Sequence, residues 1–158
     1  MHEIKKLAVR FRNAIESARE DRRFSSDQSF RNFPVGCCGI TTELLAKFLM
    51  DNGIDDNLTY ISGTYREDSQ EPLSHAWLTV NNEIVVDITG DQFRHYSNAL
   101  NCNETVYVGG YNERYNSFEI DEEEICNNYY PLDDRCIRSH LSRKKLYEII
   151  LEYIVIPN

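Results

Sequence analysis

The segment "FPVGCCGITTELLAKFL", residues Phe33 to Leu49, places two adjacent cysteines at the expected start of a helix. Leucine and phenylalanine recur at helical spacing between positions 44 and 49, which predicts an amphipathic helix over residues 41–51. The Asn52-Gly53 pair that follows is typical of a helix C-terminus. A cysteine at a helix N-terminus lies at the positive end of the helix dipole, which favours thiolate over thiol. One of these cysteines therefore has the setting of a nucleophile.

The rest of the chain is predicted to form two more helices and a set of strands. Hydrophobic spacing predicts helices over residues 3–21 and 141–154, at the two ends of the chain. The polar region 111–134 contains the acidic run Asp121–Glu124, which we interpret as a solvated helix start or a loop. The order helix, helix, antiparallel strands, helix predicts a single α+β domain over residues 1–158. The strands are expected where β-branched and aromatic residues gather, at 58–65, 74–80, 83–89 and 105–110.

The composition argues against several classes of function. The chain has 158 residues, of which 41% are hydrophobic, enough for a sizeable core. Its net charge is −9 and it has no basic stripe, so we expect neither nucleic acid nor membrane as a partner. No apolar run approaches the roughly 18 residues of a spanning helix, and the N-terminus lacks a signal-peptide core, which predicts a cytoplasmic protein. Five scattered cysteines favour free thiols in a reducing compartment over a disulfide framework.

A nucleophilic cysteine needs a base and a group that orients the base, and one predicted hairpin offers both. The segment "SHAWLTVNNEIVVDIT" carries His75 on its first strand and Asp87 on its second. A three-residue loop centred on Asn81 would place these two side chains opposite each other on one face. A two-residue turn at Asn81-Asn82 would send Asp87 to the other face. The catalytic interpretation therefore requires the three-residue loop or a bulge.

These motifs resemble a known family. A cysteine at a helix start, "HAW" on a strand and "D-x-T" at the end of its hairpin partner are similar to the transglutaminase-like branch of the papain-like cysteine enzymes. The longer string "FPVGCCGITTELL … SHAWL … VDITGDQF" also looks like a group of small, poorly characterised bacterial proteins. The resemblance covers about residues 33–93. It implies a papain-like core in which the nucleophile helix packs on a small antiparallel sheet, flanked by N- and C-terminal helices.

The resemblance also assigns roles to individual residues. The nucleophile of the family is followed directly by glycine, which selects Cys38 rather than Cys37, with His75 as the base and Asp87 as its orienting group. We expect Cys37 to pack as a small hydrophobic residue. The remaining histidines and cysteines have no partner at a telling spacing and are interpreted as structural or surface residues. An oxyanion donor is needed near the thiol; the candidates are the Cys38 backbone N–H and the side-chain amides of Gln92, ranked first, and Asn32.

The predicted function is a thiol-dependent acyl-transfer enzyme with a Cys-His-Asp triad, most simply one that hydrolyses an amide or peptide bond. An acyltransferase or transamidase could use the same triad, and a non-catalytic binding module could keep the same fold. The substrate would be a protein, a peptide or a small molecule with an amine or amide group. No cofactor or metal is expected, since a zinc site built from Cys37, Cys38, His75 and His95 lacks the usual ligand spacing.

Overall fold

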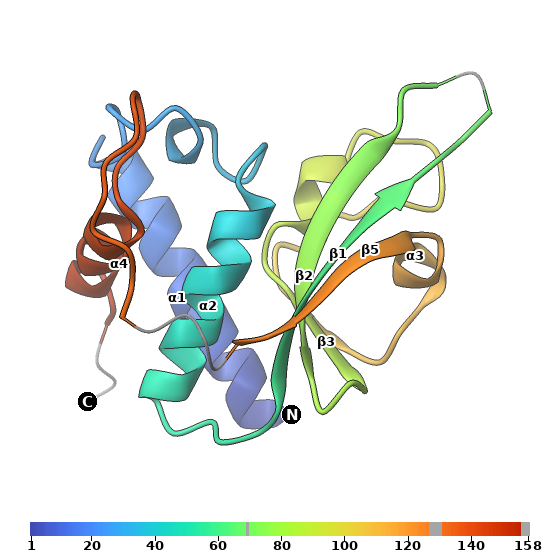
Figure 1. The fold of residues 1–158 in the computed structure, drawn as a ribbon, viewed down its shortest axis with the longest axis horizontal. Helices are drawn as coiled ribbons and strands as arrows, with labels where there is room; N and C mark the ends of the chain where they lie inside the picture. Colours follow the sequence, from blue (N-terminus) through green and yellow to red (C-terminus); the bar gives the residue numbers. More distant parts are fainter. Residues whose placement is uncertain (69, 127–130, 156–158) are drawn as a thin grey trace.

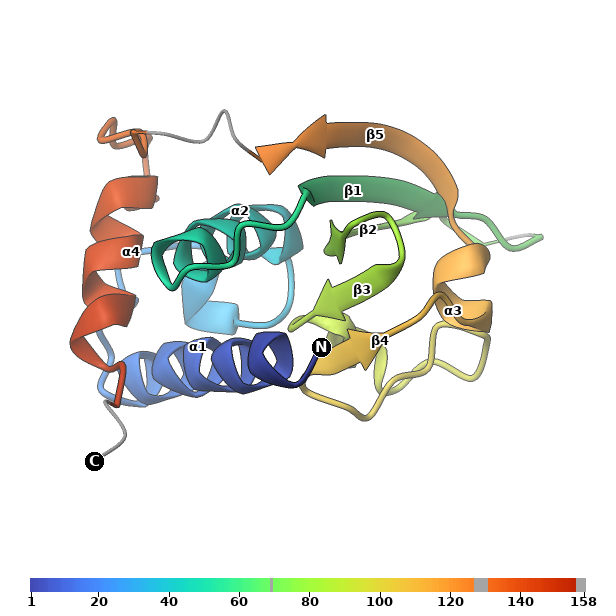
Figure 2. The same cartoon turned by 90° about the horizontal axis from the view of Figure 1, so that it is seen from below.

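The computed structural model describes residues 1–68, 70–126 and 131–155, and these form an α+β domain. Its five strands make one antiparallel sheet in the order β4-β3-β2-β1-β5, with β4 and β5 at opposite edges (Figure 2). The predicted α+β class is therefore confirmed. The elements in chain order are α1 (His2–Glu20), η1 (Phe30–Asn32), α2 (Cys38–Asp51), β1 (Leu58–Tyr65), β2 (Leu73–Val80), β3 (Ile84–Asp87), η2 (Gly90–Phe93), β4 (Tyr107–Gly109), α3 (Glu113–Asn116), β5 (Glu119–Ile125) and α4 (Arg143–Glu152).

The sheet has a different apolar cluster on each face. Helices α1, α2 and α4 gather on one side of the sheet, away from α3 (Figure 1). Successive side chains of a strand point to opposite faces, so Leu78 and Val80 of β2 join the cluster packed under these helices. Their neighbour Trp77 joins the other one. We call this second group the aromatic cluster; it consists of Ile61, Trp77, Val85, Phe93, Leu100, Tyr115 and Phe118.

The hairpin between β2 and β3 has the three-residue loop that the catalytic interpretation requires, but its centre differs from the prediction. Val80 pairs with Ile84, so the loop is centred on Asn82 and not on Asn81. Both asparagines have positive φ, 53° and 58°, a conformation that asparagine adopts more readily than most residues. The shift moves the pairing along the strand by two positions. Because this step is even, each side chain stays on its predicted face.

The acidic run is a strand and not the helix start or loop that the sequence suggested. Residues 119–125 form β5, which pairs antiparallel with β1 and shifts register between Ser62 and Gly63. Glutamate is a poor strand former, but backbone pairing with β1 overrides that preference. Because β5 lies at an edge, its charged side chains remain in solvent on both faces. Residues 127–130 of the predicted polar region lie outside the described residues.

Candidate active site

Cys38 is the first residue of α2, and Cys37 is the N-cap that precedes it. A Cβ atom at the next position, Gly39, would lie 3.2 Å from the hydroxyl oxygen of Tyr60. The glycine therefore lets the first turn of α2 approach β1 closely. The first N–H groups of a helix have no intrahelical acceptor, so the Cys38 sulfur lies in a positive local field.

The predicted base and its orienting carboxylate are in contact. His75 Nε2 lies 2.7 Å from Asp87 Oδ2, and both side chains are almost fully buried. The backbone N–H of Thr89 donates to Asp87 Oδ1 at 2.9 Å, and the Tyr115 hydroxyl donates to Oδ2 at 3.1 Å. These two donors fix the carboxylate. Continuing the hairpin register places Asp87 opposite Trp77, diagonal to His75 and on the same face.

Three rings of the aromatic cluster surround His75. The ring centre of Phe93 is 5.1 Å from that of His75 in an edge-on arrangement, and those of Trp77 and Phe118 are 5.9 and 6.0 Å away. The exposed fraction of His75 is 1%. Water is therefore excluded from the imidazole, and its interactions with charged neighbours are strong.

The Cys38 thiol and the His75 imidazole interact, and each group shifts the pKa of the other. Burial alone would raise the pKa of Cys38, but the hydrogen bond and charge of His75, with the Ala76 N–H, lower it below its ordinary value. Burial alone would lower the pKa of His75, but Asp87 and then Cys38 raise it to about 10. These opposite shifts favour a thiolate beside an imidazolium at neutral pH.

Cys37 has the opposite environment, although it is the next residue in the chain. Its exposed fraction is 2%, and its thiol donates to the Pro34 carbonyl oxygen at 3.4 Å. Burial raises the pKa of Cys37 to about 12, although Thr41 and, to a smaller extent, Arg12 lower it. The thiol is therefore protonated at neutral pH and packs in the cluster under the helices, as expected.

Gln92, the first-ranked candidate for an oxyanion donor, lies in η2 and contacts the base. Its side-chain amide nitrogen is 3.0 Å from His75 Nδ1 and donates to the Thr89 carbonyl oxygen at 3.2 Å. Since Asp87 occupies Nε2, Gln92 lies at the imidazole nitrogen that is left for the thiol. Asn32, the second candidate, is exposed on η1. The structure brings Gln92 into the site but shows no contact between Asn32 and it among the described residues.

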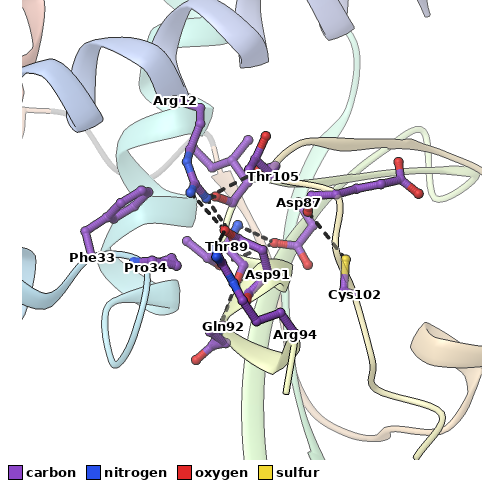
Figure 3. Close-up of polar contacts among 12 residues, drawn as sticks. Arg12, Phe33, Pro34, Asp87, Thr89, Asp91, Gln92, Arg94, Cys102 and Thr105 are labelled. Atoms are coloured by element: carbon purple, nitrogen blue, oxygen red, sulfur yellow. Dashed lines mark hydrogen bonds and ion pairs between the residues drawn. The ribbon is translucent and has the colours of Figure 1, made fainter. Parts of the chain in front are cut away.

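A buried ion pair lies beside the site, and the sequence analysis did not identify it. Arg12 reaches from α1 to Asp91 of η2 (Figure 3). Its guanidinium donates to both carboxylate oxygens at 2.8 and 2.9 Å, and to the Ile88 carbonyl oxygen at 2.6 Å. The guanidinium carbon is 4.6 Å from the ring centre of Phe33. Arg12 thus connects α1, the segment after β3 and the loop before α2.

The sequence contains one signal for this pair. Arg12 lies between Ala8 and Ile15 on the apolar stripe of the predicted first helix, and both neighbours are fully buried. A charged residue on a buried helix face needs a charged or hydrogen-bonding partner. The partner itself has no local signal, because Asp91 lies 79 positions further along the chain.

Of the other cysteines and histidines discussed above, Cys102 lies beside Asp87, since a Cβ atom at Gly90 would be 2.8 Å from Asp87 Oδ2 and 3.4 Å from the Cys102 sulfur. Cys102 and Cys126 are buried, Cys136 and His95 are exposed, and His140 is half-buried with Nδ1 3.9 Å from Asp27 Oδ2. Within residues 1–68, 70–126 and 131–155, no three His, Cys, Asp or Glu side chains are placed to hold a metal ion together. The zinc alternative built from Cys37, Cys38, His75 and His95 therefore has no assembled ligand set.

Two further findings bear on the site and the chain. Among the described residues, none of the helices combines the length and the apolar character needed to cross a bilayer. Comparisons with protein families, with curated proteins and with solved structures give no match for this chain. Functional inference therefore rests on the arrangement of Cys38, His75, Asp87 and Gln92.

Proposed function

We propose that the protein is a thiol-dependent acyl-transfer enzyme whose catalytic residues are Cys38, His75 and Asp87. The observation that carries the proposal is the chain of contacts from the Cys38 thiol through His75 to Asp87, with each pKa shifted toward the charged form. The resemblance of these segments to the transglutaminase-like branch of the papain-like enzymes supports the same roles. A buried histidine kept only for packing needs neither a carboxylate nor a thiol partner.

In the first half of the reaction, the Cys38 thiolate attacks the carbonyl carbon of an amide or ester. The carbonyl π electrons move to oxygen, and the C–S bond forms. His75, protonated at Nδ1, gives this proton to the leaving nitrogen or oxygen as the C–N or C–O bond breaks. Asp87 keeps Nε2 protonated and holds the ring plane. The products of this step are the free amine or alcohol and an acyl group on Cys38.

The negative oxygen that forms in this step needs hydrogen-bond donors. The backbone N–H of Cys38 is one, because it lies in the first turn of α2 and has no intrahelical acceptor. The side-chain amide of Gln92 is the other, since it already lies 3.0 Å from His75 Nδ1. When Nδ1 carries a proton, the Gln92 amide loses its acceptor there and becomes free to turn toward the oxyanion.

In the second half, His75 takes a proton from water or from an amine, and the resulting nucleophile displaces Cys38 from the acyl group. Water gives a carboxylic acid and makes the enzyme a peptidase or amidase. An amine gives a new amide and makes it an acyltransferase or transamidase. We favour hydrolysis because water needs no second binding site. The acyl donor is a protein, a peptide or a small molecule with an amide bond.

The proposal is tested by trapping the acyl group on the thiol. The full chain is treated at neutral pH with activated esters and with electrophiles for cysteine, and the labelled residue is identified by peptide mass spectrometry. We expect rapid labelling of Cys38 in the natural chain and in Cys37→Ala, and none at position 38 in a folded Cys38→Ala variant. Labelling no faster than that of the exposed Cys136 would instead indicate a binding module without acyl transfer.

A further inference from the structure

An open pocket of about 920 Å³ lies beside the loop that enters α2. We call it the α2-entry pocket; its polar lining includes Arg19, Arg31, Asn32 and His140. The loop and the segment that leads into α4 lie side by side at the top of Figure 1, where the Gln28 N–H donates to the Ser139 carbonyl oxygen at 2.8 Å. The volume falls in the range of small-molecule sites.

The charge of this pocket is opposite to that of the chain. The chain has 26 acidic and 17 basic residues, yet among the described residues no carboxylate lines the pocket, and its charged members there are two arginines. The nearest acid behind it is Asp27, which is fully buried and 3.9 Å from His140. The oxygens of Asp27 accept N–H groups from Ser29, Phe30 and Leu141, so its charge is directed to the backbone and not into the pocket.

Both arginines have donors to offer. Arg31 is exposed, and in the part of the chain that the structure describes its guanidinium has no carboxylate partner. Arg19 gives one N–H to the Phe33 carbonyl oxygen, which fixes its direction and leaves its other donors available. Planar guanidinium groups bind carboxylates and phosphates through paired hydrogen bonds.

The pocket borders the loop that leads to the nucleophile. Gly36, one of its lining residues, precedes Cys38 by two positions, so their Cα atoms are at most about 7.6 Å apart. A Cβ atom at Gly36 would have no neighbour within 4 Å, which shows that this side of the loop is open. His75, the partner of the thiol on the sheet, is enclosed by the aromatic cluster. Because Gly36 and the two arginines line the same pocket, a substrate chain that leaves the sulfur along this loop enters the pocket that holds both arginines.

We infer that the α2-entry pocket binds an anionic group, a carboxylate or a phosphate, on the substrate whose acyl group Cys38 attacks. This inference rests on the proposed function and names the substrate class: acyl donors that carry a negative charge a short distance from the reacting carbonyl. The net charge of −9 would by itself favour basic substrates. The pocket reverses that expectation locally, beside the loop that leads to the nucleophile.

The test uses the full chain and two matched sets of thiol reagents. One set is iodoacetylated glycine, β-alanine and 4-aminobutyrate, each with a free carboxylate; the other set is their uncharged methylamides. Inactivation rates of Cys38 are measured for each pair. We expect the carboxylate reagent of one chain length to react about tenfold faster than its methylamide, as a charge-assisted hydrogen bond allows. Protection by phosphate or by acetate then separates the two kinds of anion.

Variants of the two arginines test whether these residues cause the preference for carboxylate reagents. Arg31→Gln combined with Arg19→Gln should bring the ratio of the carboxylate rate to the methylamide rate down to about one, a ratio that corrects for any change in the reactivity of the thiol itself. Arg10→Gln on α1, which borders a different pocket, removes one positive charge without touching the site and should keep the preference. Fast alkylation without any charge preference overturns the pocket and leaves the proposed enzyme standing. A Cys38 thiol that reacts no faster than Cys136 overturns both.

Discussion

Two buried ion pairs lie side by side in this protein, and their acids, Asp87 and Asp91, are four positions apart. The Arg12–Asp91 pair joins a carboxylate to a guanidinium that stays charged at any working pH. The His75–Asp87 pair joins a carboxylate to an imidazole that can release its proton. The first pair can therefore only hold segments together, whereas the second can take part in chemistry.

The two adjacent cysteines differ in the same way, since Cys37 interacts with Arg12 of the first pair and Cys38 with His75 of the second. Burial raises the pKa of Cys37, and this effect outweighs the interactions of the sulfur with Thr41 and Arg12, which lower it. Cys38 is half-buried, and its interaction with His75 outweighs burial and lowers its pKa. A nearby positive charge is thus not enough to form a thiolate in a buried site. At Cys38 the contact and the charge come from one group, His75.

The largest effect is expected from breaking the Arg12–Asp91 pair, which we call the fixed pair because its guanidinium stays charged. Arg12→Met leaves the buried Asp91 carboxylate with only the partly exposed Arg94, 2.8 Å away, as an ion-pair partner, so the free energy of unfolding should fall by about 3 kcal/mol. Denaturant titration measures the change, and Arg10→Met is the matched control, since Arg10 is half-buried on α1 and donates to the Val155 carbonyl oxygen instead of a buried carboxylate. A loss of less than about 1 kcal/mol, the usual value for a surface pair, would contradict the conclusion that Arg12 stabilises the fold through a buried ion pair.

The double variant Arg12→Met with Asp91→Leu sharpens the comparison. Replacing both charges by apolar groups of similar volume removes the unpaired carboxylate, and most of the lost stability should return. Cys38 should then alkylate with the pH dependence of the natural chain, because the fixed pair makes no hydrogen bond to either His75 or the thiol. A large shift of the thiol pKa in this folded variant would show that the two pairs act as one unit.

The next largest effect concerns the titratable pair. His75→Ala removes the hydrogen bond and the charge that lower the pKa of Cys38, and burial then raises that pKa. Alkylation of Cys38 at neutral pH should slow by about 100-fold, since the reactive species is the thiolate. The exposed His95→Ala serves as the control, and the rates are followed by mass spectrometry. An unchanged rate in His75→Ala would remove His75 from the mechanism.

A smaller effect is expected when only the orienting acid changes. Asp87 is the main cause of the raised pKa of His75, so Asp87→Asn should lower that pKa and weaken the imidazolium beside the thiol. The thiol pKa should rise as a result, and the alkylation rate at neutral pH should fall by about tenfold. The midpoint of the pH dependence of Cys38 alkylation should move to higher pH. A midpoint that moves to lower pH would reverse the assigned sign of the interaction.

The smallest effect belongs to the neighbouring thiol. Cys37→Ala removes a small buried group, and the unfolding free energy should decrease by about 1 kcal/mol. Because Cys37 is protonated at neutral pH and bonds to the Pro34 carbonyl, the alkylation rate of Cys38 should not change. Loss of rapid labelling in a folded Cys37→Ala variant would move the nucleophile one residue toward the N-terminus.

The contacts within the site were more predictable than those around it, for a physical reason. His75 and Asp87 lie on one hairpin, and any loop with an odd number of residues keeps them on the same face. The error in the turn centre therefore left the predicted face of both side chains correct. The Arg12–Asp91 pair connects segments 79 positions apart, and no local pattern indicates such a contact. The acidic strand was mispredicted for the same reason, since its partner β1 lies far away in the chain.

The edge position of β5 affects how copies of this chain meet one another. An edge strand exposes unpaired backbone groups that a second molecule can extend into a continuous sheet. On β5 the exposed side chains of Asp121, Glu122 and Glu123 surround those groups, so two such edges repel each other in dilute salt. At about 1 M salt the screening length falls to roughly 3 Å, and this repulsion largely disappears. The colloidal stability of the protein should therefore decrease as ionic strength rises.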